Sequence, residues 1–154
     1  MILKEKGDRY EKYIGRKFEE KNNIVIYNGL IQGIKDRGVD LIIISNNRKI
    51  INLVQCKNWE TKQLELFHIE NIYEKLNHYI FLESDIKNYQ MLFNKQQLSY
   101  IKDIWSNPYQ FKIIKTLFLS HTQMVNNSKD HLIKIQLNRF LYIDMKINIC
   151  NLLQ

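Results

Sequence analysis

Two apolar runs separated by a short polar segment dominate the first half of the chain. The first run covers Val39 to Ile44, the polar segment covers Asn46 to Lys49, and the second run begins at Ile50 and stops at Gln55-Cys56-Lys57. Short apolar runs joined by a polar, turn-forming connection are typical of a β-hairpin. The pattern therefore predicts two antiparallel strands with their turn at Asn47-Arg48.

The register of this hairpin brings polar residues together at one end. A turn at Asn47-Arg48 places Asp40 opposite Gln55. Side chains alternate between the two faces of a strand, so Lys57 shares the face of Asp40 and Gln55. A direct cross-strand pair has Cβ atoms roughly 5 Å apart, and a diagonal pair roughly 7–8 Å. We therefore expect a polar patch at the edge of an apolar surface formed by Ile42, Ile44, Ile51 and Leu53.

A helix is expected before the hairpin, from about Arg9 to Lys21, because apolar residues recur there at helical spacing. These residues are Tyr10, Tyr13, Ile14 and Phe18. Asp8 is a candidate N-cap, and Glu11 follows it at the spacing of a capping box. Glu11 also lies at the edge of the face that packs on the sheet, from which it could approach Asp40. The sequence leaves both roles of Glu11 open.

The segment between this helix and the hairpin contains a strand and a charged turn. Ile24 to Tyr27 predicts a strand that stops at Asn28-Gly29. In the following segment, Leu30 to Gly38, the charged residues Lys35, Asp36 and Arg37 lie between two glycines, which is typical of a solvated turn. In the alternative interpretation, the turn presents Arg37 and Lys35 to a nucleic-acid phosphate and leads Asp40 into a site.

The chain after the hairpin contains a long apolar periodicity and then a less regular segment. Positions three or four apart predict an amphipathic helix from Lys62 to Leu82 that covers the sheet. They are Leu66, Ile69, Tyr73, Leu76 and Ile80. Residues 84–110 are expected to form an insertion over one face or edge, with a helix from Gln96 to Trp105 that ends at Ser106-Asn107-Pro108.

Two further strands are expected, Phe111 to Leu119 and Arg139 to Met145, with a short helix around Ser128 to Ile135 between them. His121 follows the first of these strands, where functional side chains often lie in mixed sheets. A lone histidine is also commonly a surface or capping residue. The order of elements predicts a mixed sheet of about four or five strands flanked by helices, in the α/β or α+β class.

Length and composition favour one domain, residues 1–154, with an ordinary core. No apolar run approaches the length of a membrane span, and the N-terminal residues do not resemble a signal peptide, so we expect a cytoplasmic protein without a membrane partner. Cys56 and Cys150 match neither a disulfide framework nor a zinc site, and Cys56 is expected in the core on the opposite face of the sheet. A net charge of +7 favours a polyanionic partner such as DNA.

The predicted patch suits phosphodiester chemistry assisted by a divalent cation. Asp40 offers a carboxylate, Gln55 a side-chain carbonyl and Cys56 a backbone carbonyl, which are oxygen ligands that Mg²⁺ or Mn²⁺ accept. Glu11 could complete the set directly or through water. Lys57 would orient the attacking water or neutralise charge that develops at the phosphate. Each residue alone has an ordinary structural explanation, but their predicted convergence favours the functional one.

These residues resemble the catalytic core of the restriction-endonuclease-like, or PD-(D/E)xK, nuclease superfamily, and they are most similar to its Mrr-type branch. The motifs are Tyr10-Glu11, Asp36-Arg37-Gly38-Val39-Asp40-Leu41-Ile42 and Val54-Gln55-Cys56-Lys57. The resemblance implies a four-stranded mixed sheet and Mg²⁺-dependent DNA cleavage. It implies Asp40 as the main metal ligand, Lys57 as the catalytic lysine and Glu11 near the metal. It covers residues 8–58, and it departs from the family at Val39, which replaces a proline, and at Gln55, which replaces the usual second acid.

The leading hypothesis is a metal-dependent DNA endonuclease of the restriction type. A homodimer is expected, because a double-strand break needs two active sites. A structure-specific nuclease similar to the Holliday-junction resolvases is an alternative, although these usually have an acid at the position of Gln55. A non-catalytic nucleic-acid-binding module of the same fold is the alternative from another class.

Overall fold

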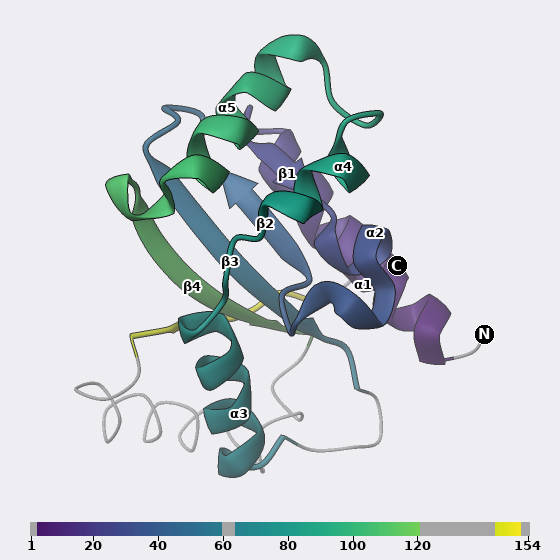
Figure 1. Ribbon diagram of the computed structural model, residues 1–154. Helices are drawn as coiled ribbons and strands as arrows, with labels where there is room; N and C mark the ends of the chain where they lie inside the picture. Colours follow the sequence, from purple (N-terminus) through teal and green to yellow (C-terminus); the bar gives the residue numbers. More distant parts are fainter. Residues whose placement is uncertain (1–2, 60–63, 121–143, 152–154) are drawn as a thin grey trace.

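The hairpin lies at the centre of a sheet with helices before and after it in the chain. The computed structural model describes residues 3–59, 64–120 and 144–151 (Figure 1). In chain order the elements are α1 (Leu3–Glu19), β1 (Ile24–Ile26), α2 (Asn28–Gln32), η1 (Gly33–Asp36), β2 (Leu41–Ile44), β3 (Ile50–Lys57), α3 (Leu66–Asn77), η2 (Glu83–Asp85), α4 (Ile86–Tyr89), α5 (Lys95–Ser106), η3 (Pro108–Gln110), β4 (Lys112–Leu119) and β5 (Lys146–Ile149).

The strands form one mixed sheet in the order β1-β2-β3-β4-β5. β1, β2 and β3 are antiparallel neighbours, whereas β4 and β5 run parallel to β3. The predicted hairpin register is confirmed, since Leu41 pairs with Val54 and Ile44 pairs with Ile51. A parallel neighbour requires a crossover connection, and α3, α4 and α5 lie within the crossover from β3 to β4. The predicted mixed sheet flanked by helices, in the α+β class, is therefore confirmed.

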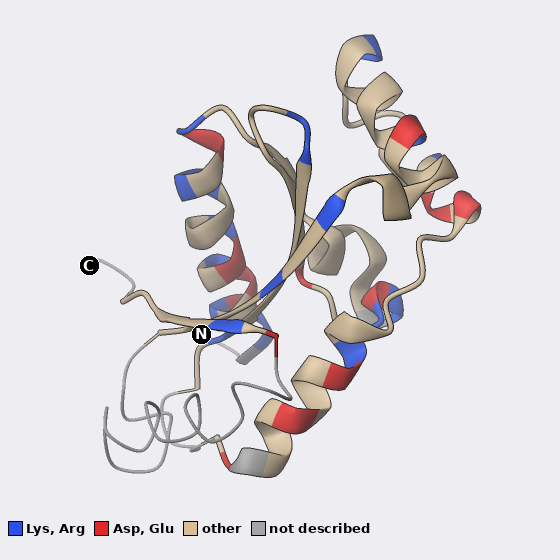
Figure 2. Cartoon of the chain, turned by 90° about the vertical axis from the view of Figure 1, so that its left-hand side faces the viewer, with Lys and Arg blue, Asp and Glu red and all other residues tan. Residues whose placement is uncertain are grey.

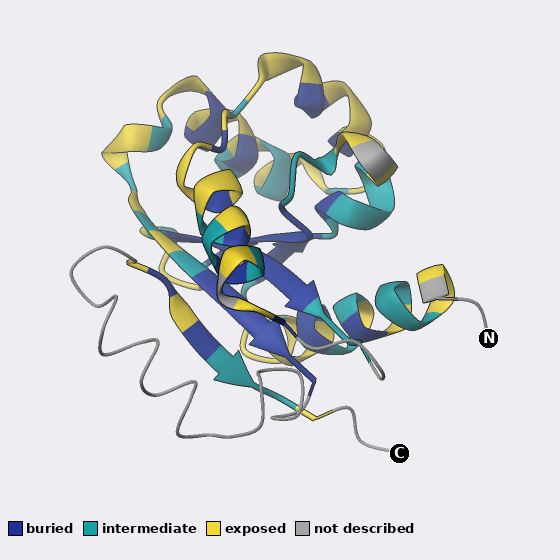
Figure 3. Cartoon of the chain, turned by 90° about the horizontal axis from the view of Figure 1, so that it is seen from below, coloured by how far each residue is buried: buried dark blue, intermediate teal, exposed yellow. Residues whose placement is uncertain are grey.

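The two faces of the sheet have different covers. One face packs against α3, α4 and α5, and its apolar strand residues include Ile42, Ile51, Leu53 and Leu117. The other face packs against α1 and includes Leu41, Ile43, Val54, Cys56 and Phe118. Figure 2 shows α1 on one side of the sheet and the remaining long helices on the other, and Figure 3 shows that buried residues concentrate in the strands. The alternation follows the period of two that extended strands impose.

The charged turn before β2 is more ordered than the sequence predicted. α2 begins directly after β1, and η1 follows α2, so most of the segment from Leu30 to Gly38 is helical. The buried side-chain amide of Asn28 donates to the carbonyls of Val39 and Asp36, at 2.8 and 3.1 Å. These bonds fix the start of α2 against the start of β2 and so determine where Asp40 lies.

The crossover helices differ from the predicted pattern in length and role. α3 ends at Asn77, earlier than predicted, and Ile80 is exposed. The helix predicted from Gln96 to Trp105 is confirmed as α5, which begins with an Asn94–Gln97 capping box. Side chains of segment 84–110 join the same apolar core as the sheet, and they include Ile86, Tyr89, Ile101, Ile104 and Trp105. This segment therefore shares with α3 the cover of one face of the sheet.

The last part of the chain adds a strand that the pattern did not predict there. β4 agrees with the strand predicted from Phe111 to Leu119, while β5 is at Lys146–Ile149. The predicted helix 128–135, the predicted strand at residues 139–143 and His121 lie outside the described residues, and Asp144 and Met145 are not in a strand. None of the helices in the described ranges combines the length and apolar character needed to cross a membrane.

Candidate active site

Asp40 lies at the end of a turn that holds it between β2 and β3. The φ angles of Arg37 and Gly38 are 57° and 83°, and Gly38 adopts this left-handed conformation without a Cβ to oppose it. The backbone N–H of Asp40 donates to the carbonyl of Val54 at 2.8 Å. The Asp40 Oδ2 atom accepts the backbone N–H of Cys56, also at 2.8 Å. The carboxylate is therefore fixed in place, and Asp40 is only 5% exposed.

Glu11 has no capping role, because α1 begins well before it. The helix starts at Leu3, so the predicted N-cap at Asp8 and its capping box with Glu11 are wrong. Asp8 lies inside the helix and pairs with Lys4, with 2.8 Å between Nζ and Oδ2. Such an i,i+4 pair favours the additional helical turn. Of the two roles that the sequence left open for Glu11, only the one beside Asp40 therefore remains.

The absence of a side chain at Gly29 lets the carboxyls of Glu11 and Asp40 meet. A Cβ atom at Gly29 would lie 2.9 Å from the Glu11 Oε2 atom and 3.3 Å from the Asp40 Oδ1 atom. The backbone N–H of Gly29 also donates to the carbonyl of Asp40 at 2.9 Å. α2 thus approaches the two carboxyls with its backbone, and a larger residue at position 29 would displace one of them.

Burial raises the pKa of both carboxyls, and the charge of Asp40 also raises the pKa of Glu11. Burial, and next the charge of Asp40, raise the pKa of Glu11 to about 9. Burial raises the pKa of Asp40 to about 7, although the N–H of Cys56 and the charge of Lys57 act to lower it. A hydrogen bond between the two carboxyls raises the pKa of Glu11 and lowers that of Asp40. Without a cation, the pair therefore retains a proton on Glu11 near neutral pH.

Gln55 and Lys57 lie on the α3 side of the sheet. Gln55 is buried, and its Oε1 atom receives no hydrogen bond from the described residues. The Lys57 Nζ atom lies 5.3 Å from the centroid of the Trp59 ring, and its charge lowers the pKa of Asp40. Lys57 therefore acts electrostatically on Asp40. Gln55 lines a pocket with Lys57, whereas the Asp40 carboxylate bonds to the backbone of Cys56 and lies beside Glu11.

Cys56 is a core residue on the α1 face, as the alternation predicts. Burial raises the pKa of its thiol well above the ordinary value, which makes the side chain inert. The backbone group of Cys56 that reaches Asp40 is the N–H. Its carbonyl as a metal ligand stays a prediction.

The residues predicted to contact nucleic acid have different surroundings. Arg37 is only partly exposed, and its guanidinium pairs with Asp85 at 2.8 Å and donates to the Tyr79 hydroxyl at 3.0 Å. The interpretation of this turn as simply solvated therefore needs correction at Arg37, whereas its contact with a phosphate stays a prediction. Lys35 is exposed, and His121 lies outside the described residues.

The donor set of the site fits a hard divalent cation. Glu11 Oε2 is buried and, like Gln55 Oε1, receives no hydrogen bond from the described residues. Within those residues no three His, Cys, Asp or Glu side chains are grouped as metal ligands, so the protein would supply two carboxylates and amide oxygens. Mg²⁺ usually keeps several waters and needs only one or two carboxylates. The residues present therefore fit this ion.

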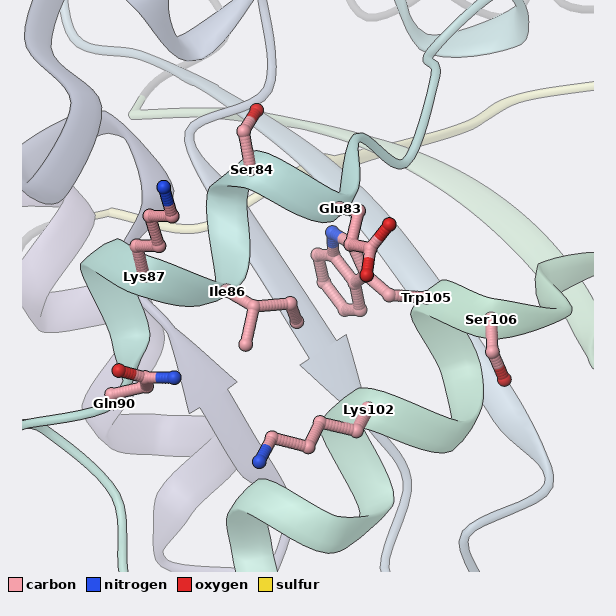
Figure 4. A pocket seen from close by; sticks show the side chains of 8 residues that line it. All are labelled: Glu83, Ser84, Ile86, Lys87, Gln90, Lys102, Trp105 and Ser106. Carbon is pink, nitrogen blue, oxygen red and sulfur yellow. The ribbon is translucent and has the colours of Figure 1, made fainter.

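Two hollows lie on the side of the sheet covered by α3, α4 and α5. One, of about 910 Å³, lies between η2, α4 and α5 (Figure 4). Its titratable lining residues are Glu83, Lys87 and Lys102, all exposed, and none of the candidate site residues lines it. The other, of about 260 Å³, includes Gln55 and Lys57 in its lining and adjoins the candidate site.

The smaller hollow also contains residues that the sequence analysis did not single out. They are Trp59, Leu64, His68, Asn71, Ile72 and Lys75. Spacing was the available signal, because positions 68, 71, 72 and 75 recur every three or four residues on one side of a helix. Their polar members lie beside the apolar stripe that was recognised.

Comparison with known proteins gives no assignment. A scan against protein-family models and searches of curated proteins and of solved structures find no match to this chain. The functional interpretation therefore depends on the residues and geometry described above.

Proposed function

We propose that the chain is a cytoplasmic DNA endonuclease that hydrolyses phosphodiester bonds with the help of Mg²⁺ or Mn²⁺. The observation behind this proposal is the carboxyl pair of half-buried Glu11 and buried Asp40, with the positive charge of Lys57 acting on Asp40. When both are ionised, the two carboxylates repel each other and are poorly solvated, which costs free energy unless a cation compensates. The net charge of +7 supports a polyanionic substrate.

The side chains have distinct roles in this proposal. Asp40 and Glu11 hold the cation through carboxylate oxygens, and Gln55 and the Cys56 carbonyl offer further oxygens. A bound cation would polarise the scissile phosphate and lower the pKa of a water. The backbone N–H of Cys56 orients the Asp40 carboxylate. Lys57 places a positive charge where negative charge develops on the phosphate.

Cleavage of supercoiled plasmid DNA with Mg²⁺ or Mn²⁺ tests this proposal. The wild-type chain should nick the plasmid, and Lys57→Ala and Asp40→Ala should lower the rate by about a hundredfold or more, as loss of a charge-stabilising group does. Lys95→Ala at the exposed start of α5 is the matched control and should retain activity. Cleavage that survives both site substitutions would contradict the assignment.

The biological role is proposed to be restriction rather than the resolution of branched DNA, because Gln55 stands where resolvases usually have an acid. A panel of unmethylated, methylated and four-way-junction DNA separates these roles. Preferential cleavage of the junction would favour the structure-specific alternative.

A non-catalytic DNA-binding module is the second candidate. It is favoured by the small number of acids, since the described site has two carboxyls and an amide where nucleases of this fold usually have another acid. Tight, strongly salt-dependent binding without metal-stimulated cleavage would support it.

A further inference from the structure

The hollow beside the candidate site, here called the α3 pocket, has a lining suited to an anion. It is formed by Gly38, Gln55, Lys57, Trp59, Leu64, His68, Asn71, Ile72 and Lys75, and its volume is about 260 Å³. This lining contains two lysines, a histidine and an asparagine as donors, and no Asp or Glu among the described residues. The volume is below the range of about 300–1,000 Å³ for drug-sized ligands, so a small group is the suitable occupant.

The charges of α3 are divided between two sides of the helix. His68, Asn71 and Lys75 follow one another at intervals of three or four residues and line the pocket. Glu70 and Glu74 are on the other side by the same periodicity, and Glu74 pairs with His78, with 3.1 Å between Oε2 and Nε2. The positive side of α3 therefore borders the pocket that contains Lys57.

Hydrogen bonding sets the tautomer of His68. Its Nδ1 atom accepts the backbone N–H of Glu65 at 2.9 Å, as part of the capping box of α3. In the neutral ring the proton must then be on Nε2. His68 can therefore act as a donor even when it is uncharged.

Lys75 is held next to the turn that positions Asp40. A Cβ atom at Gly38 would lie 2.6 Å from Lys75 Cδ and 2.8 Å from its Cβ, so the aliphatic stem of Lys75 packs on this glycine. Gly38 precedes Asp40 by two residues. This packing holds the Lys75 side chain, which lines the pocket, directly against the backbone of the turn that leads to Asp40.

We infer that the α3 pocket binds a phosphate of the substrate DNA strand next to the scissile phosphate. This deepens the proposed nuclease function and rests on it. Lys75, His68 and Asn71 supply donors to the phosphate oxygens, and Lys57 lies between this phosphate and the one that is cleaved. The pocket thereby fixes the direction in which the strand crosses the Glu11–Asp40 pair.

A methylphosphonate scan tests this contact. Oligonucleotide duplexes with one neutral methylphosphonate at successive positions are titrated with the full chain in Ca²⁺, and affinity is measured by fluorescence anisotropy. One position should weaken wild-type binding about tenfold, the size of a hydrogen-bonded contact to a charged group. In Lys75→Met, which keeps the aliphatic stem, binding of unmodified DNA should weaken similarly. A methylphosphonate at the sensitive position should then have a much smaller effect than in the wild type, because only His68 and Asn71 still donate to that phosphate. The salt dependence of binding should decrease by about one phosphate contact.

Lys95→Met, which removes an exposed lysine far from the pocket, should leave the scan unchanged. An unchanged scan in Lys75→Met, or no DNA binding at all, would overturn the inference. The inference would also be overturned if inorganic phosphate competed with DNA for the wild type but not for Lys75→Met, while no methylphosphonate position weakened binding. That result would show a site for free phosphate.

Cleavage of unmodified plasmid in Mg²⁺ is measured in parallel. Metal-dependent cleavage without a methylphosphonate position whose effect depends on Lys75 would refute phosphate binding by the α3 pocket and leave the nuclease proposal intact. A successful scan without cleavage would refute the nuclease proposal and support a binding site on α3.

Discussion

The carboxyl pair Glu11–Asp40 couples the stability of the protein to pH. The pKa values of both groups are higher in the folded chain than their ordinary values of 4.5 and 3.8, rising to about 9 and about 7. Between the ordinary and the raised pKa values, the folded state therefore binds more protons than the unfolded state. Its free energy of unfolding should then decrease as pH rises from about 4 to about 9. Thermal unfolding in EDTA should show this decrease, and Glu11→Gln should flatten it. An equally steep profile in Glu11→Gln would contradict the pairing.

A divalent cation should reverse this trend, because it binds the ionised pair and competes with protons. The increase in melting temperature caused by Mg²⁺ or Mn²⁺ should grow from pH 5 to pH 8 in the wild-type chain. Asp40→Asn should show little increase at either pH. Equal metal-induced increases in the wild type and Asp40→Asn would place the cation elsewhere.

At the residue scale, the sequence predicted the identity of the site better than its arrangement. Alternation along β3 placed Gln55 and Lys57 on one face and Cys56 on the other, because the period of a strand is local geometry. The contact of Asp40 with the backbone of Cys56 was not predictable, because strand register does not specify which backbone N–H a carboxylate accepts. Glu11 was ambiguous, since Asp8 resembles an N-cap in the sequence but lies inside α1, where it pairs with Lys4.

At the scale of elements, the Arg37–Asp85 ion pair joins the turn before β2 to the segment after α3. Asp85 is 3% exposed, and Arg37 also donates to the carbonyl of Ile80 at 3.2 Å. Arg37→Met should cost about 2 kcal/mol, less than the 3–5 kcal/mol of a fully buried pair, because a third of the Arg37 side chain is exposed. Urea unfolding measures this cost, and Asp85→Asn in the same chain should recover part of it.

The exposed neighbour Lys35 is the control for this pair, and Lys35→Met should change stability by less than about 0.5 kcal/mol. Equal effects of Arg37→Met and Lys35→Met would show that the ion pair does not stabilise the turn.

The two glycines Gly38 and Gly7 offer a matched comparison of turn and helix. Gly38→Ala should destabilise the protein by about 1–2 kcal/mol, because position 38 has a φ of 83° and its new Cβ atom would meet the Lys75 stem. Gly7→Ala should stabilise α1 by up to about 1 kcal/mol, since no atom lies within 4 Å of the new Cβ atom. The two substitutions should shift the melting temperature in opposite directions, and shifts of the same sign would contradict this account.

Local pattern predicted some elements and failed for others for physical reasons. Three elements have short-range signals in the sequence. The hairpin has a polar turn, and β4 has a continuous apolar run. α5 begins after a capping residue, Asn94, and ends shortly before Pro108. The role of segment 84–110 depends on tertiary packing, since Ile104 and Trp105 are buried in the same apolar core as residues of the sheet that are distant in the sequence. β5 was missed because Lys146–Ile149 is short and half polar, and only pairing with β4 makes it a strand.

At the scale of the whole molecule, one candidate site per chain predicts how DNA is cut. A single site cleaves one strand at a time, so linear plasmid should appear directly only when two chains act together. Sedimentation of the chain with and without DNA, beside the ratio of linear to nicked product, tests the expected homodimer. Direct linearisation by a species that remains monomeric on DNA would contradict it.

The central claim is that the Glu11–Asp40 pair binds the cation that supports phosphodiester cleavage. The most direct measurement is the initial rate of plasmid nicking as a function of Mg²⁺ concentration for the wild type, Glu11→Gln and Asp40→Asn. The account predicts metal-dependent nicking by the wild type, a higher Mg²⁺ requirement for Glu11→Gln and a rate about a hundredfold lower for Asp40→Asn. Identical Mg²⁺ dependence in all three chains, or no nicking by the wild type, would contradict it.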